Sequence, residues 1–132
     1  MSVQEMLETH PGSIADRDLV ARCIEECISC TATCTSCADA CLGEQDVTKL
    51  VRCIRLNLDC ADVCEATGRI VTRRTEADLT LVRDSVVACA TACRICADEC
   101  DRHAEHHDHC RVCAEECRRC ELACHDLLAA IR

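Results

Sequence analysis

Cysteine recurs along most of this chain at alternating steps of four and three residues. The longest run consists of Cys23, Cys27, Cys30, Cys34, Cys37 and Cys41. An α-helix turns once in about 3.6 residues, so side chains spaced in this way lie on one face of a helix. The spacing therefore predicts a helix over residues 16–42 with a row of thiols along one side. Gly43 is the expected C-terminal stop.

Three further segments repeat the same spacing. Residues 46–72 carry Cys53, Asn57, Cys60 and Cys64. Residues 76–103 carry Cys89, Cys93, Cys96 and Cys100, with His103 next in the row. Residues 108–131 carry Cys110, Cys113, Cys117, Cys120 and Cys124. Long helices joined by short connections predict an all-α fold, an antiparallel up-down-up-down four-helix bundle with its cysteine rows facing inward.

The first residues differ from the rest of the chain. Residues 1–15 are expected to form a short helical extension, and residues 16–132 a single cysteine-lined bundle domain. Ser2 with Glu5 resembles a capping box, which predicts a short helix over residues 3–9. A Pro-Gly pair then ends it. Further along, Thr75 with Asp78 is expected to cap the third long helix.

The interior has to be built without aromatic rings, because the chain has no Phe, Tyr or Trp but 18 cysteines. Cysteine is a small hydrophobe, yet Leu or Ile would fill a bundle core better, so the sulfur atoms themselves are needed. Cysteines three or four residues apart on one helix are poorly oriented for disulfides. Redox Cys-x-x-Cys pairs normally lie at an exposed helix N-terminus. The pattern therefore favours metal binding without catalytic turnover, and we expect the chain not to be an enzyme.

Charge and hydropathy limit the classes of partner and the cellular location that we expect for this chain. The net charge of −9 disfavours nucleic acid, and no segment is apolar enough to cross a membrane. The N-terminus lacks the basic and apolar runs of a secretory signal, so a cytoplasmic location with reduced thiols is expected. Charged residues off the cysteine rows are expected on solvated outer faces. They include Arg22, Glu25, Glu26, Asp98, Glu99, Glu115, Glu116, Arg118 and Arg119.

Ligand chemistry then favours one metal. Soft thiolates select Cu(I), Zn(II) or iron–sulfur clusters. Zinc takes closed sites of four ligands, usually from loops, and the Cys-Pro signature of an iron–sulfur site is missing. Cu(I) accepts two or three sulfurs, and thiolates can bridge neighbouring ions, which predicts roughly one Cu(I) per cysteine. A zinc or cadmium metallothionein-like buffer and an iron–sulfur electron carrier remain as alternatives.

The two ends of an antiparallel bundle built from these helices differ. One end collects aliphatic residues and forms what we call the aliphatic plug: Leu19, Val20, Ile70, Val71, Leu79, Val82, Val86, Leu127, Leu128 and Ile131. The other end, the histidine mouth, collects His103, His106, His107 and His109. Copper is expected to enter and leave at the histidine mouth. His103 and His107 continue the third cysteine row and are predicted ligands, whereas His106 and His109 are either ligands or solvent-facing caps.

A few other residues could bind a soft metal. Asn57 lies within a cysteine row, where a buried Asn either fixes helix register or offers its amide oxygen as a ligand. Met1 and Met6 lie outside the expected bundle and are not predicted ligands. His10 and His125 are expected to be incidental.

These motifs resemble the bacterial cytosolic copper storage proteins over nearly the whole chain. The resemblance is carried by the run from Cys23 to Cys41, by Cys53-Ile-Arg-Leu, by Cys60-Ala-Asp-Val-Cys64 and by His107-Asp-His-Cys110. It implies reversible storage of many Cu(I) ions in thiolate clusters, assembly as a homotetramer and a role in copper buffering and tolerance. It also implies that His103, His107 and Asn57 are ligands. The copper donor or chaperone is not indicated.

Overall fold

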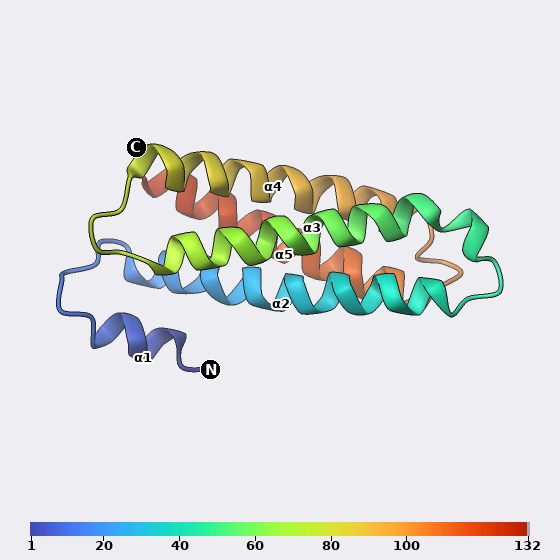
Figure 1. Cartoon of the computed structure of the whole chain (residues 1–132), viewed down its shortest axis with the longest axis horizontal. Coiled ribbons are helices and arrows are strands. Elements are labelled where there is room, and N and C mark those ends of the chain that lie inside the picture. The colour runs from blue at the N-terminus through green and yellow to red at the C-terminus, as the bar shows by residue number, and fades with distance from the viewer. Residues whose placement is uncertain (132) are drawn as a thin grey trace.

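A computed structural model describes residues 1–131, within which long antiparallel helices form a four-helix bundle (Figure 1). These helices are α2 (Arg17–Leu42), α3 (Val51–Thr72), α4 (Leu79–Asp101) and α5 (Asp108–Ala130). Each packs against its two neighbours in the order α2–α3–α4–α5 and back to α2. The predicted all-α, up-down-up-down bundle is confirmed. Over the same residues, no helix combines the length and apolarity that a bilayer crossing requires.

Helix ends follow local chemistry. α2 stops at Leu42, as expected; the Gly43 N–H donates to the carbonyl of Ala40, and the Glu44 N–H donates to that of Cys41. α3 begins later than residue 46, because the tighter 3₁₀ turn η1 (Val47–Lys49) occupies the start of that segment.

The predicted cap of α4 is wrong in its details. Glu76 has φ 57°, in the left-handed region, so the helix cannot include it. α4 instead begins at Leu79, and the carboxylate of Asp78 accepts the Leu81 N–H at 3.1 Å. Asp78 is therefore the capping residue in place of Thr75.

The short helix α1 (Val3–Glu8) forms where expected but is held differently. Ser2 has φ −81° and ψ 2° and its side chain makes no capping bond, so the predicted capping box is wrong. An N-cap needs an extended backbone to bring its oxygen over the first turn, and Ser2 lacks it. Packing holds α1 in place, because Leu7 is buried and Gln4 donates to Glu25 of α2 at 3.2 Å.

Cysteine side chains fill most of the bundle interior, and small residues flank them. All 18 cysteines are buried and free of disulfides. Alanines and one glycine lie beside the cysteine rows and let the helices approach closely. A Cβ atom on Gly68 of α3 would lie 3.1 Å from the Cβ of Cys27 on α2. Close helix packing therefore depends on the absence of larger side chains here.

The aliphatic plug forms largely as predicted. Val20, Val71, Val86 and Leu127 are fully buried at the end of the bundle where the α3–α4 connection lies. Leu79 differs, since it is the first residue of α4 and is 58% exposed. The α2–α3 and α4–α5 connections lie at the opposite end of the bundle.

Two glutamates expected on the solvated face are buried. Glu99 is 7% and Glu116 is 4% exposed, because each lies next to a cysteine row where a neighbouring helix closes over it. Glu116 Oε1 accepts from Ser29 Oγ at 2.9 Å and from Arg119 at 3.0 Å. Its Oε2 has no hydrogen-bond partner among the described residues. An unpaired carboxylate oxygen in this position costs stability.

This burial generates a prediction for Glu116→Gln. Burial first, and then Glu26, raise the pKa of Glu116 to about 7 from an ordinary 4.5. The unfolded chain ionises first, so the unfavourable contribution of Glu116 grows as pH rises from about 4.5 to about 7. We expect the metal-free variant to gain about 1–2 kcal/mol in free energy of unfolding at pH 8. At pH 4.5 the gain should vanish. Denaturant unfolding under reducing conditions measures it, with exposed Glu115→Gln as control, and an equal gain at both pH values would contradict the burial argument.

Candidate metal centre

The sulfur atoms of the four helices form a continuous contact network. Cys30 Sγ lies 3.7–3.9 Å from the sulfur atoms of Cys34, Cys60, Cys93 and Cys117. These distances exceed the disulfide bond length of about 2.05 Å by far. They bring thiols from α2, α3, α4 and α5 close enough to share one metal ion.

Sets of four sulfurs recur along the tube, each with its atoms within 4.8 Å of one another. They include Cys27, Cys89, Cys120 and Cys124; Cys30, Cys64, Cys93 and Cys120; Cys30, Cys34, Cys60 and Cys117; and Cys34, Cys96, Cys113 and Cys117. Several sulfurs, such as Cys30, belong to two sets. Thiolates shared in this way can bridge ions in neighbouring sets, whereas isolated four-ligand sites share none.

Asn57 lies inside this network and is fully buried. Its Oδ1 accepts thiol hydrogens from Cys96 at 3.1 Å, Cys113 at 3.3 Å and Cys100 at 3.5 Å. Its Nδ2 donates to Cys53 at 3.8 Å. The amide thus links α3 to α4 and α5, which suits a register role, and its oxygen faces sulfur, which suits a ligand role.

At the histidine mouth, His109 contacts two thiols. Its Nδ1 lies 3.5 Å from Cys37 Sγ and 3.6 Å from Cys110 Sγ. Cys37, Cys41, His109 and Cys110 form one set of possible ligands. A groove of about 360 Å³ between α2 and α5 is lined in part by Cys37 and His109. Sequence reasoning left His109 undecided, although its position directly before Cys110 in the last cysteine row was a usable signal.

The two histidines predicted as ligands contact carboxylates. α4 ends at Asp101, so His103 lies in the following turn, and its Nε2 is 2.9 Å from Glu99 Oε2. His107 Nδ1 lies 2.5 Å from Glu44, and its Nε2 lies 3.1 Å from Asp46. Their role as ligands stays a prediction. His107 would have to give up a carboxylate to bind copper, whereas His103 uses only Nε2 for Glu99 and could bind through Nδ1.

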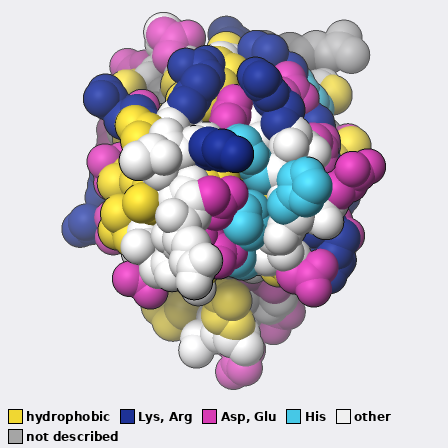
Figure 2. Space-filling model, turned by 90° about the vertical axis from the view of Figure 1, so that its right-hand side faces the viewer, with side chains coloured by type: hydrophobic (Ala, Val, Ile, Leu, Met, Phe, Trp, Pro, Cys, Tyr) yellow, Lys and Arg dark blue, Asp and Glu magenta, His cyan; other side chains and the backbone are white. Residues whose placement is uncertain are grey.

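The histidine mouth combines these rings with acidic and basic side chains (Figure 2). Glu44 Oε2 also accepts from His109 Nε2 at 3.0 Å, and the rings of His107 and His109 stack with centroids 5.4 Å apart. Asp46 first, and then Glu44, raise the pKa of His107. The hydrogen bond from His109 lowers the pKa of Glu44, and that from His107 lowers the pKa of Asp46. Each of these three groups therefore favours its charged form more than it would in water.

The thiol protons matter for metal binding. Burial is the largest cause that raises the pKa of Cys41, at the mouth, to about 11. Hydrogen bonds from Cys124 and Cys27 lower the pKa of Cys23, near the plug, to about 5. A thiol such as Cys41 is protonated at neutral pH, so metal binding there releases a proton.

The remaining sulfur and imidazole groups lie apart from the tube. Met1 and Met6 are 76% and 66% exposed on the N-terminal extension. His10 Nδ1 accepts the Gly12 N–H at 2.9 Å, and His125 on the outer face of α5 pairs with Glu121 at 3.4 Å. Each has local partners or an exposed position that accounts for it without metal.

Comparison with known proteins gives consistent matches. The family model described as copper storage protein matches residues 16–129. The structure of the copper storage protein Ccsp from Streptomyces lividans, loaded with 10 copper equivalents, is 53% identical with a TM-score of 0.95. The alignment covers 96% of this chain and 98% of that one.

Two further relatives are more distant. Cu(I)-bound copper storage protein BsCsp3 is 35% identical with a TM-score of 0.72, over 80% of this chain and 94% of that one. The uncharacterised cysteine-rich protein YhjQ of Bacillus subtilis is 36% identical over 107 residues, which cover 81% of this chain and 94% of that protein.

The charged network at the mouth predicts a pH dependence. The folded pKa of His107 lies above its ordinary value of 6.5, so its stabilising contact is complete below that value and is lost as pH rises through the raised pKa. The contact is also lost in acid, because Glu44 and Asp46 become protonated as pH falls through their lowered pKa values. NMR titration of the imidazole should give a pKa above 6.5, and Asp46→Asn should lower it. A pKa of His107 that Asp46→Asn leaves unchanged would contradict this network.

Proposed function

The chain belongs to the copper storage protein family, and we propose that it stores many Cu(I) ions as thiolate clusters inside the bundle. The observation that carries the proposal is the sharing of sulfurs between four-thiol sets along the tube. A bridging thiolate serves two ions, so the ratio approaches one Cu(I) per cysteine. Copper is a stored cargo in this proposal, and the protein has no catalytic role.

The alternatives use the same sulfurs differently. A zinc or cadmium buffer would surround each ion with four thiols, so even with shared thiolates it would hold far fewer ions than the chain has cysteines. An iron–sulfur cluster places iron and inorganic sulfide between its cysteines. Thiols 3.6–3.9 Å apart, such as Cys34 and Cys117 or Cys30 and Cys60, leave no room for them.

Copper enters and leaves, in this proposal, at the histidine mouth. Cys37 is buried but lines the floor of a groove together with His109, so an ion bound by His109 in this groove would lie next to this thiol. The opposite end is closed by the aliphatic plug, whose side chains offer no ligand. His109 would pass Cu(I) to Cys37 and the thiols beyond it, with help from His103 through Nδ1 and from His107 once it is freed from a carboxylate.

Location and assembly complete the proposal. A relative from Streptomyces lividans, 57% identical with a TM-score of 0.85, over 86% of this chain and 95% of that one, is described as a cytosolic copper storage protein. We place this chain in the cytoplasm too, where thiols stay reduced. We also propose a homotetramer, which exposed aliphatic side chains on the outer helix faces, such as Ile28 and Leu122, would help to bury.

The first prediction of this proposal is the copper capacity. Anaerobic titration of the reduced protein with a Cu(I) probe should saturate at roughly 18 ions, with about one proton released per cysteine that was protonated. Far-UV circular dichroism of the metal-free protein should already be helical, because the packed helices define the tube. Saturation at four to six ions would instead indicate four-coordinate sites and exclude the shared-thiolate store.

The second prediction concerns the mouth. His109→Ala should slow the loading of the first ions by about tenfold, because it removes the nitrogen beside Cys37 and Cys110, but should leave the capacity nearly unchanged. Stopped-flow absorption of Cu(I)–thiolate formation measures the rate. His125→Ala, an exposed histidine outside the tube, is the matched control. If both variants load at the same rate as the original chain, uptake does not pass by His109.

A further inference from the structure

Two arginine side chains flank the histidine mouth on its α3–α4 side. Arg52 Nε lies 3.6 Å and Arg102 Nη1 lies 3.7 Å from the same oxygen atom, Oε1 of Glu99. The other oxygen of Glu99 binds His103 Nε2 at 2.9 Å. One buried carboxylate therefore holds two guanidinium groups beside a mouth histidine.

This group carries more positive charge at its surface than Glu99 neutralises. The side chains of Arg52 and Arg102 are 70% and 74% exposed, whereas that of Glu99 is 8% exposed. The cations thus face solvent while the anion lies beneath them. Lys49, on η1, is exposed at the same end and its charge acts on Asp46. Figure 2 shows basic side chains directly beside the histidines.

The position of Arg52 is unfavourable for the helix that carries it. It is the second residue of α3, whose first turn contains no acidic residue. Unpaired N–H groups give a helix N-terminus a partial positive charge, so an acidic residue is preferred there and a cation costs stability. The positive field of the helix end adds to that of Arg52. An acidic chain of net charge −9 therefore keeps two exposed guanidinium groups at the histidine mouth, beside the carboxylates of Glu44 and Asp46.

The cargo reaches the protein as an anion, if the proposed copper storage holds. Cu(I) is soft and binds thiolates wherever they are present. An ion held by two thiolates carries one net negative charge, and carboxylates on the carrier add more. A chain of net charge −9 repels such complexes over its general surface.

We propose that Arg52 and Arg102 form a docking site for anionic Cu(I) bis-thiolate complexes, next to the ligands that receive the ion. The donor docks against the guanidinium groups, and its two thiolates are exchanged for thiols of the mouth such as Cys37 and Cys110. Each donor thiolate leaves as a thiol and takes the proton of the cysteine that replaces it. Copper stays Cu(I) throughout, so no oxidant or reductant is needed.

The test compares donors of opposite charge on the full metal-free chain. Cu(I) is supplied with 3-mercaptopropionate, which gives an anionic complex, or with cysteamine, which gives a cationic one. At about 10 mM ionic strength, Arg52→Gln/Arg102→Gln should load about three- to tenfold more slowly from mercaptopropionate. The difference should disappear near 1 M salt, where charges are screened within about 3 Å. Loading from cysteamine should not slow.

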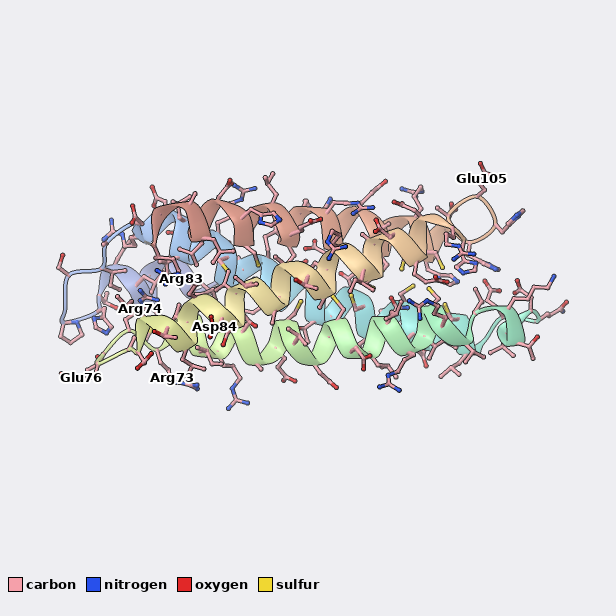
Figure 3. The ribbon with its side chains drawn as sticks, turned by 90° about the horizontal axis from the view of Figure 1, so that it is seen from above. Arg73, Arg74, Glu76, Arg83, Asp84 and Glu105 are labelled. Atoms are coloured by element: carbon pink, nitrogen blue, oxygen red, sulfur yellow. The ribbon has the colours of Figure 1, made fainter. Side chains whose placement is uncertain are left out.

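Matched variants separate docking from general charge. Arg69→Gln/Arg73→Gln removes the same two charges near the opposite end; Figure 3 places Arg73 at the end of the bundle away from Glu105. This control should load at the original rate, and Arg52→Lys/Arg102→Lys should restore it. Equal rates for the two double Gln variants, slow or unchanged, would overturn the docking site.

Two readouts complete the experiment. Copper capacity at saturation reports storage separately, so a full capacity with unchanged rates rejects the docking site alone, and a missing capacity in the original chain rejects the proposed function. Cu(I) held by an acidic Cys-x-x-Cys peptide serves as a third donor. If Arg52→Gln/Arg102→Gln slows loading from this peptide as well as from mercaptopropionate, the site also accepts a protein donor. If it slows loading from mercaptopropionate alone, the site serves small thiols.

Discussion

The contact between sulfur atoms of different helices is the constraint on which the rest of this structure depends. Thiols of α2 lie 3.6–3.9 Å from thiols of α3, α4 and α5, so the helices must run close together where the cysteine rows meet. Cysteine side chains are short and cannot span a wider gap. This requirement explains the small residues beside the cysteine rows. The clearest example is Gly68, which packs directly against Cys27. The absence of aromatic residues follows too, because a ring would force the helices apart.

A core of this kind is a compromise between folding and binding. Thiols bury less apolar area than Leu or Ile, so the bundle gives up hydrophobic stabilisation along the tube. The aliphatic plug returns some of it at one end, where Val20, Val71 and Leu127 are fully buried. The cost of burying polar groups arises at two other positions, Asn57 and Glu116. Asn57 accepts three thiol hydrogens inside the tube, whereas Glu116 keeps one buried oxygen without a partner among the described residues.

The helical bundle and its inward cysteine rows could be predicted from sequence because one strong periodicity fixes both. Spacing of four and three determines the face of a helix without reference to any other segment, so the burial of every cysteine followed directly. The burial of Glu99 and Glu116 could not be predicted in the same way. Each lies one position away from a cysteine, and only the neighbouring helix decides whether such a flank is covered. The start of α4 depended on the left-handed backbone of Glu76, which no pattern signals.

The mouth was the least predictable part of the candidate site. His103 and His107 continue the cysteine row in sequence, but α4 ends at Asp101. Helical spacing therefore does not predict where their side chains point. The orientation of His109 depends on Cys37 of α2, 72 residues away in sequence. Connections between helices take their shape from tertiary partners, and the partners here, Glu44 and Asp46, come from the other connection at the same end.

That last contact has a mechanical meaning. The segment before η1 and the segment before α5 are fastened to each other by His107, which holds Glu44 with one ring nitrogen and Asp46 with the other. An ion that took either nitrogen would undo half of this clasp. Because His109 Nε2 also binds Glu44, the two segments would stay joined, but by one contact fewer. The strength of the link between the two connections at this end therefore depends on whether His107 is free of metal.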